Sequence, residues 1–304
     1  GAYPLPTPGD PPTPGDIDGA GEQGSSATAT RPTTAHGIPA LAMLADMTDD
    51  GLARPFDFDA KYGAGARRGL VLGGGGIFFI AWQVAYLREL ESRGVDLAAA
   101  DVVVGTSAGS LVSAILTGGK LRRFAGELSL LSKVPKVVDA LAPAGNLAPS
   151  QDHALQLFQQ AGDNQPATIK AIGYAALAAH AAPAAKMRRS VSAAVRMTKW
   201  PAASLHIATV DTYTGERLII DRSAGVPVAA ASAASSAVPG LFSPQPILDR
   251  KCMDGGVSGS GIHSDVVCGA SRAVILSLGA NATMPEAMMT IKPTALADEV
   301  AALQ

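Results

Sequence analysis

The chain has 304 residues, of which 47% are hydrophobic and 16% charged, so it is long and apolar enough to bury a sizeable core. Its formal net charge of -2, without a run of like charges, gives no overall attraction to nucleic acid, and we expect no nucleic-acid partner. The two cysteines are too few for a disulfide framework or a four-ligand zinc site, so we expect reduced thiols and no metal.

The first part of the chain has the composition of a leader. Residues 1 to about 37 are rich in Pro, Gly, Ser and Thr, a composition that cannot compensate for the entropy lost on ordering. A more apolar and acidic stretch follows, with a short helix expected over 38–45. We predict a disordered or weakly ordered leader over residues 1–60. Because no charged segment precedes an apolar one there, we expect no export signal and a cytoplasmic protein.

The ordered domain is expected to begin with two successive strand–loop–helix units. Residues 69–72 form a short apolar run that ends in four glycines, and residues 80–90 repeat apolar side chains at helical spacing. Residues 101–104 form a second apolar run, followed by a turn and a helical pattern over 110–117. Two such units in succession predict a parallel sheet with helices packed on its faces.

The rest of the chain is expected to complete a single domain over residues 61–304. The stretch at about 121–200 has a mainly helical pattern and is interpreted as an insertion. Residues 205–211 and 217–221 are typical of two strands joined in a hairpin. The last expected elements are a small-residue helix over 226–234, a short helix near Asp265 and the strand "AVILSL".

The sequence "GTSAG" places a serine between two glycines directly after the second apolar run. In acyl-transfer enzymes the nucleophilic hydroxyl projects from a sharp strand-to-helix turn, which needs small neighbours because the two chain segments nearly touch. Gly105 and Gly109 meet this need on either side of Ser107. The N-terminal N–H groups of the following helix would also face developing negative charge. Ser107 is therefore a candidate nucleophile, with an ordinary strand-to-helix turn as the alternative.

The glycine run Gly73–Gly76 at the end of the first apolar run is a candidate oxyanion hole. Backbone N–H groups approach an oxyanion closely only where side chains are absent. A phosphate cradle at a helix N-terminus, as in dinucleotide-binding folds, is the alternative. That alternative fits less well, because Phe78 stands where G-x-G-x-x-G spacing needs its third glycine.

A serine hydroxyl needs a base that takes its proton. Asp254 follows an expected strand, and the neighbouring Gly255 and Gly256 would let it approach another loop closely. Since the ordinary pKa of an aspartate is about 3.9, Asp254 would need burial and a hydrogen bond to the serine to act as a base. An ordinary turn is the alternative for "DGG". His263 is a second candidate base, because the chain order Ser, Asp, His matches that of α/β-hydrolase triads.

The segment between Asp163 and Asp211 contains basic residues but no acidic ones. On a helix, its basic side chains would lie opposite an apolar face formed by Met187, Val191, Ala194 and Val195. Such a helix could lie on an anionic bilayer. The alternative is an ordinary solvated helix whose apolar side packs on the core. The most apolar stretch, 171–185, is too short and too weakly hydrophobic to span a bilayer, so any membrane contact would be peripheral.

These signals occur together and in one order, and the chain resembles the bacterial patatin-like phospholipases from about Gly69 to Leu278. The stretches that carry the resemblance are "LVLGGGGI", "VVVGTSAGSLVSAIL", "LHIATVDTYTGERLIID", "ASSAVPGLFSP" and "CMDGGV". The resemblance implies an α/β protein with a three-layer α/β/α fold and a mainly parallel central sheet. It also implies a Ser–Asp dyad, with Ser107 as the nucleophile, Asp254 as the general base and Gly73–Gly76 as the oxyanion hole.

The predicted function is that of a serine acyl hydrolase that cleaves lipid esters through an acyl-enzyme, as a phospholipase A, lysophospholipase or esterase does. Its expected partners are a lipid or other acyl ester and a peripheral membrane surface. No metal or organic cofactor is needed, and the sequence does not indicate an oligomeric state. The alternative is a catalytically weak or inactive patatin-like domain that binds a lipid or a partner.

The chain departs from the family pattern directly after the glycine run. The family's loop usually carries a further glycine there and often Arg or Lys, whereas this chain has Ile77, Phe78 and Phe79. A bulky residue at positive φ would cost about 1–2 kcal/mol, so either the loop bends elsewhere or the oxyanion hole is imperfect. Without the basic residue, uncharged acyl esters are expected among the substrates.

Overall fold

This computed structural model describes residues 54–55, 62–131, 147–161, 164–278, 299–301 and 303, all within the unit formed by residues 49–304. The expected helix over 38–45 and most of the predicted leader lie outside the described residues. Two leader residues, Arg54–Pro55, form strand β1 and pair with strand β5 of the domain. Helices fall within the segment 121–200, as described below, but the status of that segment as an insertion stays a prediction.

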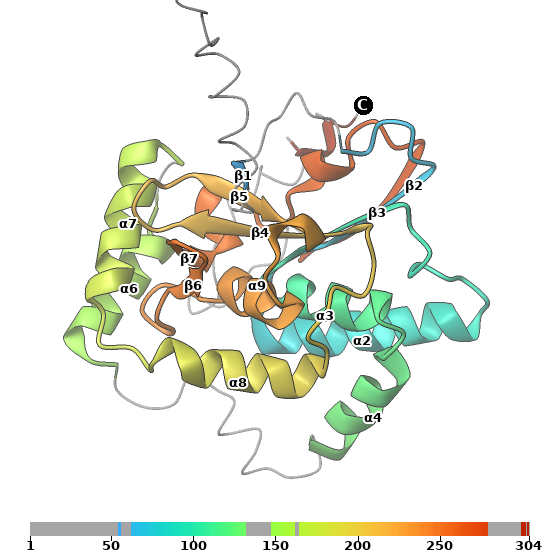
Figure 1. Ribbon diagram of the computed structural model, residues 1–304, viewed down its shortest axis with the longest axis horizontal. Helices are drawn as coiled ribbons and strands as arrows, with labels where there is room; N and C mark the ends of the chain where they lie inside the picture. The colour runs from blue at the N-terminus through green and yellow to red at the C-terminus, as the bar shows by residue number, and fades with distance from the viewer. Residues whose placement is uncertain are drawn as a thin grey trace, which may run out of the picture. The chain divides into compact units, whose positions relative to one another are not determined.

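A sheet with a parallel centre runs through the domain (Figure 1). The strand order is β1-β5-β4-β3-β2-β8, in which β4, β3, β2 and β8 are parallel neighbours, β5 is antiparallel to β4, and β1 is antiparallel to β5. The bounds of the five main strands are β2 Arg68–Leu72, β3 Val102–Thr106, β4 Leu205–Asp211, β5 Arg217–Ile220 and β8 Arg272–Leu276. This confirms the expected mainly parallel central sheet of an α/β protein.

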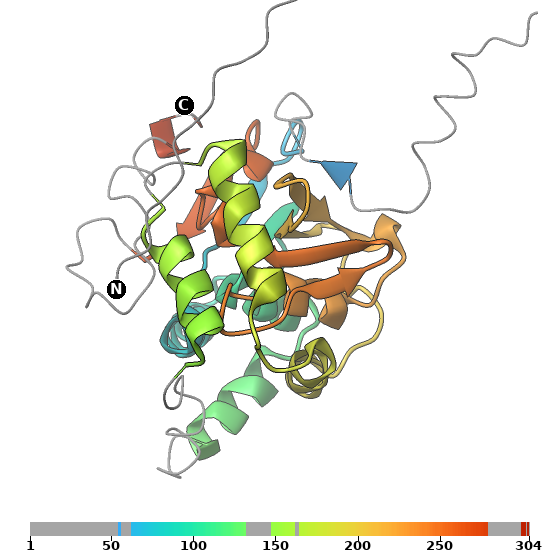
Figure 2. The same ribbon diagram turned by 90° about the vertical axis from the view of Figure 1, so that its left-hand side faces the viewer.

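A second hairpin joins the sheet beside β4. It consists of β6 (Gln245–Ile247) and β7 (Arg250–Asp254), and β7 pairs antiparallel with β4. The sequence indicated a strand before Asp254 but not the short strand β6. The turned view shows the hairpin lying beside two helices of the helical segment (Figure 2).

Helices cover both faces of the sheet, so the domain has three layers. The described helices are α2 (Gly76–Ser92), α3 (Ala108–Thr117), α4 (Leu121–Leu131), α6 (Pro149–Gln159), α7 (Pro166–Ala178), α8 (Ala184–Val195) and α9 (Val228–Ser235). Three short 3-10 turns, η2 (Arg222–Ala224), η3 (Gly255–Ser258) and η4 (Ser264–Val267), follow strands or loops. Helices α2, α3, α8 and α9 pack on one face, below the sheet in Figure 1, and α7 and η4 pack on the other.

The apolar runs of the strands are continuous because both of their faces are buried. In β2, Leu70 and Leu72 pack on the side of α2 and α3, whereas Val71 packs on the side of η4. This alternation follows from the period of two in a strand, which sends successive side chains to opposite faces. Both faces of β4 are covered in the same way, so all seven of its residues are buried.

The apolar face of α8 lies against the core. Val191 and Val195 are buried, and Met187 and Ala194 pack against the same cluster as the residues of α3 and α9. Trp200, just beyond the helix, donates its indole N–H to the carbonyl of Val226 at 2.8 Å. Because its apolar side is already covered, α8 is an ordinary amphipathic helix of the core, and only its basic side faces outward.

Candidate active site

Ser107 makes the turn between β3 and α3 by itself. The strand ends at Thr106 and the helix begins at Ala108, so Ser107 alone reverses the chain direction, with φ 51° and ψ -119°. A residue with a side chain is strained at this positive φ, and such strain is found preferentially at functional sites. Ser107 is buried, with only 4% of the residue exposed.

The two glycines beside Ser107 occupy positions where chain segments touch. A Cβ on Gly109 would lie 1.9 Å from the carbonyl oxygen of Leu72 and 2.8 Å from that of Gly73. A Cβ on Gly105 would lie 2.3 Å from the Oγ of Ser113. Any side chain at either position would push α3 away from the strands, so the turn requires glycine at both.

Two serines at the C-terminal end of α9 hold the backbone of the turn. The N–H of Ser107 donates to the Oγ of Ser235 at 2.9 Å, and that hydroxyl donates in turn to the carbonyl of Ala208 at 2.6 Å. Ser236 donates to the carbonyl of Ser107 at 3.1 Å. Sequence reasoning assigned no role to these two serines, although the stretch "ASSAVPG" that contains them was one of those carrying the family resemblance.

Asp254 lies near the Ser107 turn because its strand, β7, pairs with β4, which in turn pairs with β3. It is the last residue of β7 and lies opposite Thr209 of β4, on the face of the sheet that α3 and α9 cover. The next residue, Gly255, packs so closely that a Cβ there would lie 2.6 Å from the carbonyl oxygen of Ala208 and 3.0 Å from the Cγ2 of Thr106. Since Thr106 directly precedes Ser107, the structure brings the two predicted dyad residues together from distant parts of the chain.

The carboxyl group of Asp254 is completely buried. Burial raises its pKa to about 6, while the Gly256 N–H, which donates to Oδ1 at 2.8 Å, and the nearby Ser107 hydroxyl lower the pKa and offset only part of the rise. Oδ2 accepts no hydrogen bond of normal geometry from the described residues, so the Ser107 hydroxyl is a near neighbour rather than a bonded one. In unliganded enzymes such catalytic hydrogen bonds are often long and tighten with substrate.

Two of the four glycines in the predicted oxyanion hole use their amides within the fold. The N–H of Gly73 donates to the carbonyl of Leu276 at 2.9 Å, and that of Gly74 donates to the carbonyl of Gly261 at 2.8 Å. An amide that already donates to a backbone carbonyl is not free to bind an oxyanion. The candidate donors within Gly73–Gly76 are therefore narrowed to the last two.

Those last two glycines also make the bend of the loop. Gly75 has φ 155° and Gly76 has φ 68°, and α2 begins at Gly76, so the N–H groups here are those that a helix leaves without an internal partner. Ile77, Phe78 and Phe79 lie in the first turn of α2. The loop therefore bends at glycines, and the strain considered for a bulky residue at this place does not arise.

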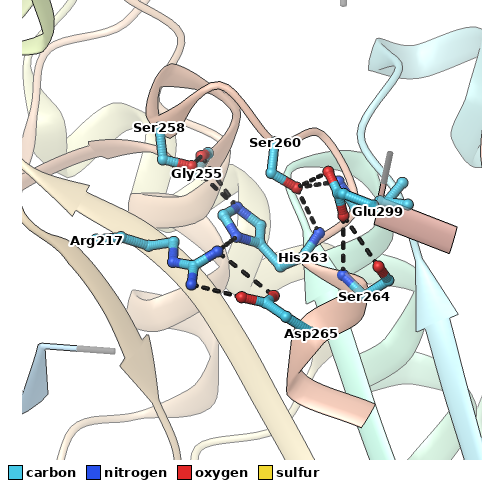
Figure 3. Close-up of polar contacts among 9 residues, drawn as sticks. Arg217, Gly255, Ser258, Ser260, His263, Ser264, Asp265 and Glu299 are labelled. Carbon is cyan, nitrogen blue, oxygen red and sulfur yellow. Dashed lines mark hydrogen bonds and ion pairs between the residues drawn. The ribbon is translucent and has the colours of Figure 1, made fainter. Parts of the chain in front are cut away.

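The ring of His263 bonds to neither side chain of the candidate dyad. Its Nδ1 is 2.9 Å from the Nη1 of Arg217, and its Nε2 is 3.1 Å from the carbonyl oxygen of Gly255 (Figure 3). Burial, together with the charge of Arg217, lowers the pKa of His263 to about 3. Because both ring nitrogens have partners other than Asp254 and Ser107, the geometry does not support a Ser–Asp–His triad.

The described residues hold no metal-binding cluster, since no group of three or more His, Cys, Asp or Glu side chains converges among them. Cys252 is buried and Cys268 half-buried, and neither forms a disulfide. Burial raises the pKa of the Cys252 thiol to about 12, which makes it a poor nucleophile. In the part of the chain that the structure describes, no helix combines the length and the apolar character needed to cross a membrane.

Comparison with known proteins gives one family, and the similar solved structures include VipD and ExoU. The family model described as patatin-like phospholipase matches residues 70–267, which is more than half of the chain. VipD from Legionella pneumophila is 14% identical, with a TM-score of 0.31 over 62% of this chain and 46% of that one. The type III effector protein ExoU is 23% identical, with a TM-score of 0.26 over 58% of this chain and 41% of that one. This chain thus spans less than half the length of either, and no curated protein matches it.

Proposed function

Because the chain belongs to the patatin-like phospholipase family, whose name denotes hydrolysis of lipid esters, we propose that it is a serine acyl hydrolase working through Ser107 and Asp254. One observation carries this proposal: a strained serine turn lies beside a completely buried carboxylate, one oxygen of which has no partner among the described residues. A buried acceptor without a donor lowers the stability of the fold, so its presence in a native structure calls for a functional explanation. The hydroxyl of Ser107 is the donor that this acceptor would use.

In the proposed reaction, Asp254 takes the proton of the Ser107 hydroxyl as the oxygen attacks the ester carbonyl. The tetrahedral oxyanion is held by the amides of Gly75 and Gly76, while Gly74, whose Cβ would lie 3.2 Å from that of Ser107, keeps the glycine loop against the serine. The protonated Asp254 then gives its proton to the leaving alkoxide, which departs as an alcohol. Water attacks the acyl-enzyme, Asp254 accepts its proton, and the fatty acid leaves as Ser107 recovers its own proton.

The environment of Asp254 suits this role. A general base works best when its pKa lies near the working pH, and an ordinary aspartate is too weak a base for that. Burial raises the pKa of Asp254 from 3.8 to about 6, which makes its carboxylate a stronger base and still leaves it ionised at neutral pH. The N-terminus of α3, which begins directly after Ser107, favours the negative charge that develops there.

Peripheral contact with lipid fits α2 better than α8. Phe78 is 68% exposed, Trp82 48% and Tyr86 40%, and their spacing of four residues places them on one face of α2. Trp82 stacks on Tyr86 with 5.1 Å between ring centroids. Because α2 starts at the glycine loop, this aromatic row begins next to the candidate oxyanion hole. We propose that it meets the surface of an aggregated lipid substrate.

The decisive experiment compares the wild-type protein with Ser107→Ala. Hydrolysis of a short p-nitrophenyl ester and of a phospholipid is measured, together with covalent labelling by a fluorophosphonate probe. We expect turnover and labelling in the wild-type protein and neither in the variant. If the folded wild-type protein is neither labelled nor active, the chain is a lipid- or partner-binding member of the family rather than an enzyme.

A further inference from the structure

A polar network with a completely buried histidine at its centre lies behind the loop that carries Asp254. Its centre is His263, which has no exposed surface and lies in the left-handed region with φ 52°. Figure 3 shows Arg217 and Asp265 on one side of the imidazole ring and the carbonyl of Gly255 on the other. The proposed reaction does not use the ring of His263 as a base, so its burial needs another explanation.

The contacts fix the protonation state of the ring. A guanidinium group can only donate, so the Nδ1 of His263 must accept the hydrogen bond from the Nη1 of Arg217 at 2.9 Å. The ring is therefore neutral, and its single proton is on Nε2. That N–H donates to the carbonyl oxygen of Gly255 at 3.1 Å, with the Oγ of Ser258 more distant at 3.5 Å. The tautomer of His263 is thus set by an arginine from a different strand.

Arg217 is itself held in place. Its Nη2 forms an ion pair with the Oδ2 of Asp265 at 2.7 Å, and its Nη1 lies 3.4 Å from Oδ1 of the same carboxylate. Arg217 is the first residue of β5, so the chain of contacts runs from a strand of the sheet, through the imidazole ring, to the residue after Asp254. The charge of Arg217 is balanced by Asp265 and leaves His263 free to act as a neutral connector.

A second set of contacts fixes the backbone of His263. Its N–H donates to the Oγ of Ser260 at 2.8 Å, and that hydroxyl donates to Glu299 at 2.5 Å. The other carboxylate oxygen of Glu299 accepts the N–H of Ser264 at 3.2 Å and its hydroxyl at 3.1 Å. The ring therefore projects from a segment that is tied down on both sides of it.

We infer that His263 is a positioning residue: by donating to the carbonyl of Gly255 it holds Asp254 in place beside Ser107. The backbone is held on either side of the Asp254 side chain: the N–H of Asp254 donates to the carbonyl of Ala237 at 3.0 Å, and the carbonyl of the next residue, Gly255, accepts from His263. This inference rests on the proposed function. It predicts that loss of the imidazole N–H lowers turnover although the ring never touches substrate.

Two substitutions of His263 test the roles of the two ring nitrogens separately. The side-chain amide of glutamine reaches the position of Nε2 and can donate to Gly255, whereas that of asparagine reaches only the position of Nδ1 and can accept from Arg217. We expect His263→Asn to lower kcat on a short p-nitrophenyl ester by about tenfold to a hundredfold with little change in KM, because small displacements of a catalytic group have effects of this size. His263→Gln should keep kcat within about threefold of the wild-type value. Equal losses in both variants, or a smaller loss in His263→Asn, would overturn the inference.

A measurement on the unaltered protein tests the inference even if both variants fail to fold. Nitrogen NMR of the His263 ring should show the proton on Nε2, and the ring should stay neutral across the pH range in which activity rises. A ring that carries its proton on Nδ1, or that takes up a second proton in parallel with the loss of activity, would contradict the proposed connection.

The Ser107→Ala variant is measured in the same assays. If it is as active as the wild-type protein, the proposed function fails. If it is inactive while the glutamine and asparagine variants behave alike, only the positioning role fails.

Discussion

Gly255 packs directly on Thr106: a Cβ added to this glycine would lie 3.0 Å from the threonine Cγ2 and 2.6 Å from the neighbouring carbonyl oxygen of Ala208. One residue precedes the candidate nucleophile and the other follows the candidate base. The two loops that carry the proposed chemistry therefore touch, and on the side of Gly255 no side chain lies between them. The two loops can lie this close because residue 255 is a glycine and has no Cβ.

Gly255→Ala is expected to lower both turnover and stability. The added Cβ meets a backbone oxygen, which cannot rotate away, so the loop must shift and carry Asp254 with it. Overpacking of this kind costs about 1–3 kcal/mol in the free energy of unfolding. Chemical denaturation and ester hydrolysis measure the two effects.

Gly126→Ala is the matched control for that substitution. Gly126 is an exposed residue inside α4, where nothing lies within 4 Å of an added Cβ. The alanine should stabilise the helix by up to about 1 kcal/mol and leave kcat unchanged. If Gly255→Ala and Gly126→Ala have the same effect on kcat and stability, close packing at Gly255 does not position the site.

The activity of the wild-type protein should rise with pH through about 6. Asp254 must be ionised to take the proton of Ser107, and burial raises its pKa to about 6. The measurement is kcat/KM against pH on an uncharged ester, which has no titration of its own in this range. An acid limb centred near 4 would mean that Asp254 is solvated in the working enzyme.

Asp254→Asn should abolish turnover and increase stability at neutral and alkaline pH. The folded-state pKa lies above the unfolded value, so the stabilising contribution of Asp254 is fully present below 3.8 and is lost as the pH rises through about 6. The loss is about 3 kcal/mol for a shift of this size. Urea unfolding at pH 4 and pH 8 should therefore show an advantage of the variant only at the higher pH. The same difference from wild type at both values would contradict the assigned shift.

Phe78→Ala should weaken binding to phospholipid vesicles. The side chain is 68% exposed at the start of α2, and its transfer from water into an apolar phase is worth about 1.5–3 kcal/mol, which corresponds to a loss of tenfold or more in affinity. Tyr174→Ala is the control, because Tyr174 is a similarly exposed aromatic, at 55%, on α7. Co-sedimentation that falls equally in both variants, or in neither, would exclude the aromatic row of α2 as the contact surface.

Much of the fold could be predicted from local pattern. Strand β4 was expected over the residues that form it, because both of its faces are buried and its apolar run is unbroken. The turn at Ser107 was also predictable, since the close approach of chain segments at Gly105 and Gly109 restricts both positions to glycine. These features depend on residues that are near one another in the sequence.

What could not be predicted depends on partners far away in the chain. The amide of Gly73 is used by Leu276, and the ring of His263 is set by Arg217, and neither pairing leaves a local signal. Strand β6 is three residues long and contains Pro246, so it has no strand pattern of its own. For α8, the sequence predicted an apolar face but could not distinguish a bilayer from the core as its neighbour, because the two have the same polarity.

The hydrogen bond from Gly74 to the carbonyl of Gly261 joins the glycine loop to the segment between Asp254 and His263. This backbone hydrogen bond thus links two parts of the proposed machinery. One would receive negative charge and the other would move protons. Substitutions in the two loops should not have independent effects on rate, since residues in one bonded network couple energetically. Any effort to redesign one loop for a new acyl group would have to treat the other as part of the same unit.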